Sequence, residues 1–145
     1  AATLSCTDAH HLVEQADGRF SSLGSGTDSA FGGEPSTLVL PGADYCVIAG
    51  SASHAAYRCR WTYAYRDPQA TLMYEEVVSA FAACLGGDAV VVDDQAVNHP
   101  DTSDAYLFTL PRADARITLK DKRELDSTFV FFFIDGADPA AHAER

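Results

Sequence analysis

Two cysteines in the middle of the chain constrain its fold more than any other feature. Cys46 lies in an apolar segment, 44–50, and Cys59 lies in a second segment, 55–65, with alternating apolar and polar residues. If residues 51–54 form the turn between two antiparallel strands, Cys46 and Cys59 are directly opposed. Opposed residues have Cβ atoms about 4.5–5.5 Å apart, which is close to the spacing in a disulfide. The pattern therefore predicts a disulfide-linked β-hairpin.

The other two cysteines are Cys6 and Cys84. An even number of cysteines without a Cys-x-x-Cys pair is typical of disulfides rather than of a zinc site. The opposed hairpin positions favour the pair Cys46–Cys59, which leaves Cys6–Cys84 to join the N-terminal region to a later helix. The alternative, in which each hairpin cysteine pairs with Cys6 or Cys84, stays open.

The cysteines and the first residues of the chain indicate a cellular location. Stable disulfides form in oxidising compartments. The chain begins Ala1-Ala2-Thr3, with small residues and no Met, as expected of a mature exported protein whose signal peptide has been removed. We therefore expect a periplasmic or secreted protein.

Length and charge narrow the possible classes of protein. A chain of 145 residues without a change of composition predicts one globular domain, 1–145, with a flexible Gly/Ser-rich loop at 24–36 and a frayed tail at 136–145. No apolar stretch approaches the roughly 18 residues that a transmembrane helix needs. The net charge of −11 argues against general nucleic-acid binding, which requires a basic surface.

Hydrophobic periodicity predicts two helices and about five strands. Apolar residues recur at helical spacing over 7–22, and again between an Asp67-Pro68 start signal and Gly86. Segments 37–40 and 90–92 are candidates for further short strands, and the acidic stretch that leads to Asp104 is predicted to be loop. The main strands are expected at 44–50, 55–65, 104–110, 115–121 and 127–134.

The order of these elements predicts an α+β fold. It is an antiparallel sheet of about five strands with two helices packed mainly on one face, in the order α-β-β-α-β-β-β, held by two disulfides. Segment 127–134 is apolar at every position from 129 to 134, which is typical of a central strand or of a strand that meets another subunit. The second case predicts a homodimer through Val130, Phe132 and Ile134.

The basic residues are concentrated on or just beyond two predicted strands, 55–65 and 115–121. Strict alternation places Tyr57, Cys59 and Trp61 on the core side of 55–65, so the residues between them project outward. If the two strands are neighbours, their outward cations form a positive patch for a protein or another anionic partner. A competing interpretation is that such charges only prevent aggregation of the sheet. Six of the ten basic residues are candidates for the patch: Arg58, Arg60, Arg66, Arg116, Lys120 and Lys122.

Motifs for catalysis are missing, and one acidic region is a weaker candidate site. The Gly-x-Ser-x-Gly, His-Glu-x-x-His and phosphate-loop patterns do not occur, and nothing indicates a cofactor. The region 88–104 is rich in aspartate, and hard cations prefer clustered oxygen ligands. Its candidate ligands are Asp93, Asp94, His99 and Asp101.

Two functions from different classes follow from these patterns. The first is a non-catalytic exported binding module, such as an inhibitor, an immunity-type protein or a chaperone-like protein, which recognises a protein or anionic partner through the basic outer face of its sheet. The alternative is a small hydrolase or cation-binding enzyme that uses the 88–104 region with His99.

Overall fold

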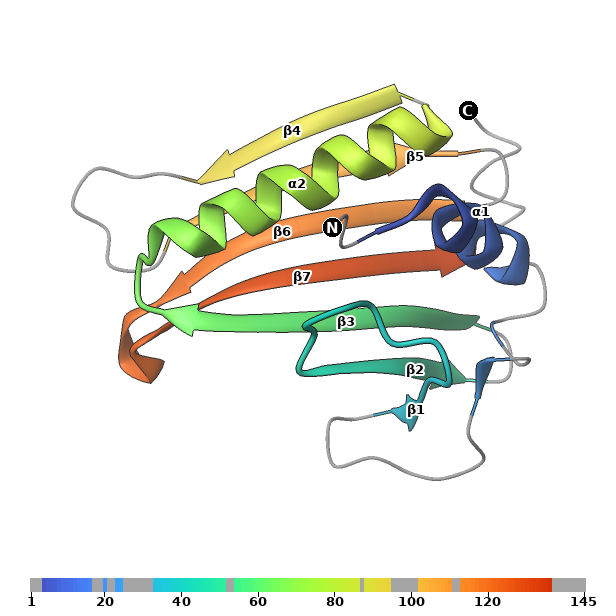
Figure 1. Ribbon diagram of the computed structural model, residues 1–145, viewed down its shortest axis with the longest axis horizontal. Helices are drawn as coiled ribbons and strands as arrows, with labels where there is room; N and C mark the ends of the chain where they lie inside the picture. The colour runs from blue at the N-terminus through green and yellow to red at the C-terminus, as the bar shows by residue number, and fades with distance from the viewer. Residues whose placement is uncertain are drawn as a thin grey trace.

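Seven antiparallel strands form one sheet in the computed structural model (Figure 1). The structure describes residues 4–16, 20, 23–24, 33–51, 54–86, 88–94, 102–110 and 113–136. Within them the strand order is β1-β2-β3-β7-β6-β5-β4. The elements are α1 (Cys6–Gln15), β1 (Glu34–Pro35), β2 (Tyr45–Ser51), β3 (His54–Ala64), α2 (Pro68–Leu85), β4 (Asp88–Asp94), β5 (Ser103–Thr109), β6 (Ala113–Lys122) and β7 (Ser127–Gly136).

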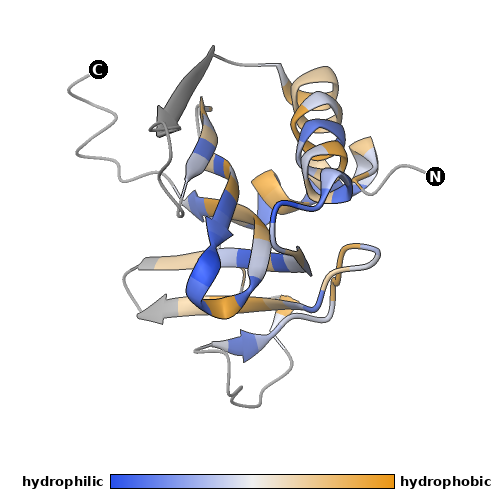
Figure 2. Cartoon of the chain, turned by 90° about the vertical axis from the view of Figure 1, so that its left-hand side faces the viewer, coloured by the Kyte–Doolittle hydropathy of each residue, from blue (hydrophilic) through white to orange (hydrophobic). Residues whose placement is uncertain are grey.

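The connection through α2 determines which strands are central. It takes the chain from β3 to β4 at the far edge of the sheet, and the chain returns as β4, β5, β6 and β7 until β7 pairs with β3. Both helices lie on the same side of the sheet (Figure 2). We call the opposite face, on which no described helix lies, the outer face.

The predicted α+β class is confirmed, and the sheet is larger than expected. Two strands are added: β1, which has two residues, and β4, which contains the predicted 90–92 segment and extends into its acidic flanks. The sequence predicts loop for the aspartates of these flanks, but they belong to β4, an edge strand, where charged residues are common. The side chains of β4, most of 24–36, and 137–145 lie outside the described residues, while Gly136 ends β7.

Helix α1 is shorter than the predicted 7–22. It begins as expected, with the Ser5 hydroxyl accepting a hydrogen bond from the Asp8 backbone N–H at 3.1 Å. It ends at Gln15, and Phe20 has a positive φ of 58°, a conformation that no α-helix contains. Phe20 and Leu23 are nevertheless buried, so their helical spacing reflected burial in the core rather than helix.

Alternation along β7 separates the core from the outer face. Val130, Phe132 and Ile134 are each 0% exposed, and the Phe132 ring packs against Phe81 of α2 with centroids 5.9 Å apart. The prediction that these three residues form a homodimer surface is wrong, because they face the helices of their own chain. The outer face of β7 carries Phe129, Phe131 and Phe133 instead.

Both disulfides have the predicted connectivity. Cys46 and Cys59 are paired residues in the β2–β3 register, with Cα atoms 4.1 Å apart. Cys6–Cys84 joins the start of α1 to the end of α2. The hairpin disulfide lies in the core, so its role is structural.

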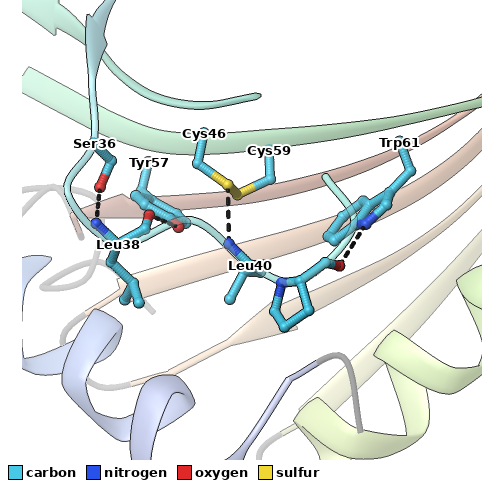
Figure 3. Close-up of a disulfide and its surroundings, with 8 residues drawn as sticks. Ser36, Leu38, Leu40, Cys46, Tyr57, Cys59 and Trp61 are labelled. Atoms are coloured by element: carbon cyan, nitrogen blue, oxygen red, sulfur yellow. Dashed lines mark hydrogen bonds between the residues drawn. A yellow bond between two sulfur atoms is a disulfide. The ribbon is translucent and has the colours of Figure 1, made fainter. Parts of the chain in front are cut away.

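A segment of irregular chain completes the core beside the helices. Residues 36–43, which we call the strap, cross β2 and β3 on the helix side (Figure 1). The predicted strand 37–40 does not form here, because its backbone groups bond to side chains. The Leu40 N–H donates to Cys46 Sγ at 3.4 Å, while Tyr57 and Trp61 donate to the carbonyls of Leu38 and Pro41 at 2.6 and 3.1 Å (Figure 3).

We expect mild reduction to open the two disulfides in a fixed order. Cys6 is exposed and Cys84 is half-buried, whereas Cys46 and Cys59 are 2% and 0% exposed. Thiol exchange requires access to a sulfur, so Cys6–Cys84 opens first. Stepwise reduction, alkylation and peptide mass spectrometry measure the order, and alkylation of the hairpin cysteines first would contradict it.

Tyr57→Phe tests the strap. Burial raises the pKa of Tyr57 well above its ordinary value of 10, and nearby Asp8 adds to the shift. The folded protein therefore keeps this proton to a higher pH than the unfolded chain, and stability falls as pH rises above about 10. The variant loses the hydrogen bond to the Leu38 carbonyl, so we expect its free energy of unfolding to fall by about 1–2 kcal/mol near neutral pH. Urea unfolding should also show a shallower alkaline loss in Tyr57→Phe, and an identical pH dependence would contradict this account.

Candidate functional site

The register of the three central strands brings cations and aromatic rings together on the outer face. Arg58 on β3 pairs with Phe133 on β7, and Phe133 pairs with Arg116 on β6. Neighbouring strands are about 4.8 Å apart, so these residues form one row across the sheet. The two basic strands, β3 and β6, therefore lie near each other but are not paired as predicted, because β7 lies between them.

A hollow of about 560 Å³ lies on this face, over β3, β7, β6 and β5. Its lining includes three of the predicted cations, Arg58, Arg116 and Lys120. Apolar side chains from the two strands that flank β6 line it too, chiefly Phe131 and Phe133 from β7 and Leu107 from β5. All three are half-buried. The outer face is therefore a mixed surface of cations and apolar groups.

Small side chains explain why the sheet is hollowed here. Thr118 on β6 pairs with Ala105 on β5 and with Phe131 on β7. The next outward positions along β6 carry the long side chains of Arg116 and Lys120, because alternate residues share a face. The short side chains of Thr118 and Ala105 therefore lie among longer ones and leave unfilled space.

Arg116 and Lys120 form no ion pair with another described residue, whereas Arg60 and Arg66 each lie beside an aspartate. Arg116 is exposed and Lys120 is half-buried. The two positions are four residues apart on one strand, so their Cα atoms are separated by about 13 Å with Thr118 midway. An anion in the hollow would therefore have a cation on each side.

Arg60 is held by neighbours at the side of the sheet. Its Nε lies 3.2 Å from Asp44 Oδ2, and its guanidinium carbon lies 5.0 Å from the ring centroid of Tyr45 and 5.1 Å from that of Phe129. Thr62 also donates a hydrogen bond to the same Asp44 oxygen. Asp44 thus neutralises this part of the patch locally.

Arg66 and Lys122 lie apart from the hollow. Arg66 follows β3 with a positive φ of 56°, and its Nε is 3.5 Å from Asp121 Oδ2. Asp121 also accepts hydrogen bonds from Thr102 and Thr128 at 2.6 and 2.7 Å. This network links β3, β6 and β7 at one end of the sheet, and Thr128 lies on the helix side. Lys122 pairs with Ser127 at the end of β6.

Two carboxylates limit the positive region at the end of the hollow that lies away from Lys120. Asp114 on β6 and Asp135 on β7 are paired residues that also line the hollow, one row beyond Arg116. The hollow is therefore polarised along β6, with acidic groups at one end and Lys120 toward the other.

The alternative cation site is not tested by the described residues. Asp93 and Asp94 lie in β4, where side chains are not described, and His99 and Asp101 lie outside the described residues. Among the side chains that are described, no group of three or more His, Cys, Asp or Glu residues is arranged to hold a metal ion.

Comparison with known proteins gives no assignment. No protein-family model matches the chain, and neither a curated protein nor a solved structure matches it. In the described part of the chain, no helix is long and apolar enough to cross a membrane.

Neutralising the two cations of the hollow should leave stability unchanged. Arg116→Gln and Lys120→Gln remove no ion pair, so we expect the free energy of unfolding to stay within about 0.5 kcal/mol of the wild type. Asp44→Asn is the contrasting variant, because it weakens the contacts to Arg60 and Thr62 and should lose about 1 kcal/mol. Urea unfolding measures both changes. An equal loss in all three variants would mean that Arg116 and Lys120 support the fold.

Proposed function

We propose that this chain is a non-catalytic, exported binding module that holds an anionic partner on the outer face of its sheet. The observation that carries the proposal is the pair Arg116 and Lys120 above a hollow with apolar walls. In a protein of net charge −11, two cations on one face of β6 without ion pairs among the described residues form a local site for an anion.

The position of β6 weakens the competing explanation. Cations that prevent aggregation are expected on edge strands, where unpaired backbone groups are exposed. The edges of this sheet are β1 and β4, whereas β6 is paired on both sides by β5 and β7. Arg116 and Lys120 therefore protect no edge, so the part of the competing explanation that concerns edge strands does not apply to them.

The disulfides support the proposed export. Two disulfides are compatible with an oxidising compartment, since cytosolic thiols are normally kept reduced. A rigid sheet that presents its binding groups from paired strands suits an inhibitor, an immunity-type protein or a chaperone-like protein, each of which works by binding alone.

Charge reversal at one residue tests the proposed function. The immobilised protein is exposed to an envelope extract of its native cells, and Arg116→Glu is compared with Arg123→Glu. Arg123 is an exposed residue of the turn between β6 and β7 and does not line the hollow. Both variants replace an arginine with a glutamate, so they change the net charge of the protein equally. We expect Arg116→Glu to lose at least tenfold in apparent affinity for the retained partner, about 1.4 kcal/mol, while Arg123→Glu binds as the wild type does.

The salt dependence gives a second readout of the same experiment. Retention by the wild type should weaken as salt is added, because screening reduces attraction between charges. A partner that both variants retain equally, or that salt does not release, would contradict binding through the outer face.

A further inference from the structure

We propose that the ligand of the hollow is a small amphipathic carboxylate, with one anionic head group and an apolar body. This inference rests on the proposed function and deepens it. The head group lies over Thr118 between Arg116 and Lys120, and the apolar body lies against Phe131, Phe133 and Leu107.

The size of the hollow favours a small molecule. Its volume of about 560 Å³ lies inside the range of about 300–1,000 Å³ that is common for small-ligand sites. Two of its lining residues, Thr118 and Ala105, have short side chains and are only 8% and 6% exposed, so they leave room between the longer side chains around them. A flat protein surface would leave this room unfilled, whereas a small ligand can enter it.

The head-group position follows from the polar atoms that face it. The Thr118 hydroxyl forms no hydrogen bond with another described residue, so it is available to a carboxylate oxygen. Arg116 offers a planar fork of N–H donors and Lys120 offers a compact positive charge. Hydrogen bonds between such cations and a carboxylate are stronger than those between neutral groups.

The apolar lining excludes a purely hydrophilic anion as the best ligand. Phe131, Phe133 and Leu107 lie on the strands that flank β6, so apolar surface borders the cations on both sides. A hydrophilic anion would leave that surface in water, and a neutral hydrocarbon would cover the cations without pairing them. A ligand with both parts satisfies both kinds of group.

The acid pair favours a single negative charge. Asp114 and Asp135 lie one row beyond Arg116, so a second anionic group on that side of the head would meet like charges. A polyanion extended along β6 would therefore be repelled at this end. We infer a monocarboxylate rather than a polyanionic glycan.

A chain-length series tests this inference. Butanoate, hexanoate, octanoate and decanoate are titrated by calorimetry below their micellar concentrations, with octanol and citrate as matched probes. Each added methylene should tighten binding by about fourfold until the hollow is filled. Octanol, which lacks the charge, and citrate, which lacks the apolar body, should each bind at least tenfold more weakly than octanoate.

Three variants locate the site. Arg116→Gln and Lys120→Gln should each weaken octanoate binding by about tenfold, while Arg123→Gln leaves it unchanged. Thr118→Leu puts a larger side chain into the hollow and should abolish octanoate binding, with a circular dichroism spectrum and Tm close to those of the wild type. If Thr118→Leu fails to fold, the two Gln variants still decide the outcome.

The results separate this inference from the proposed function. Citrate binding as tightly as octanoate, with no dependence on chain length, overturns the amphipathic ligand but leaves a site for anions. Octanoate binding that Arg116→Gln and Lys120→Gln do not change overturns the head-group position. If octanoate does not bind, while Arg116→Glu still loses the partner from the envelope extract, this inference is wrong and the proposed function stands.

Discussion

The pairing of β7 between β3 and β6 is the constraint on which the rest of the structure depends. In a strand, side chains alternate between faces, so a shift of one residue would exchange the two faces of the sheet. The observed register sends Val130, Phe132 and Ile134 into the core and leaves Phe131 and Phe133 outside. The same register aligns Arg58 and Arg116 with Phe133. Core and candidate site are therefore two consequences of one alignment.

Two covalent ties and the strap hold the elements that face the core. Cys46–Cys59 links β2 to β3, and Cys6–Cys84 links α1 to α2. The strap adds hydrogen bonds from Tyr57 and Trp61 on the part of the sheet that the helices leave open. All of these contacts lie on the helix side. On the outer face, Arg60 and Thr62 contact Asp44, whereas Arg116 and Lys120 form no ion pair with a described residue and so support no such contact.

Local sequence patterns predicted the structural features that depend only on residues close in the chain or opposed across one tight turn. The Cys46–Cys59 register and the outward direction of Arg58 followed from alternation and turn length, and the Asp67 cap followed from its sequence signal. The central position of β7 was one of two interpretations of its apolar sequence, but its neighbours β3 and β6 could not be predicted, because they depend on where the α2 connection returns the chain. Sequence alone therefore leaves open a dimer surface of Val130, Phe132 and Ile134, which the structure buries in the core.

The hollow escaped prediction for a related reason. Nothing in the sequence marks Thr118 and Ala105, and they lie side by side in the lining of the hollow only because β5 and β6 pair in this register. Outward-facing small residues in two strands were the available signal, but the sequence does not say that they are opposed. The charges of Arg116 and Lys120 were visible in the sequence, whereas the lack of an ion pair with a described residue required the structure.

The most direct test of the account is to map the ligand contact on the sheet. Backbone amide chemical shifts are measured by NMR as octanoate is added to the wild-type protein. The account predicts that the largest changes cluster in β5, β6 and β7 around Thr118, with small changes in α1, α2 and the strap. Changes centred on the helix side, or no changes at millimolar octanoate, would contradict a ligand site on the outer face.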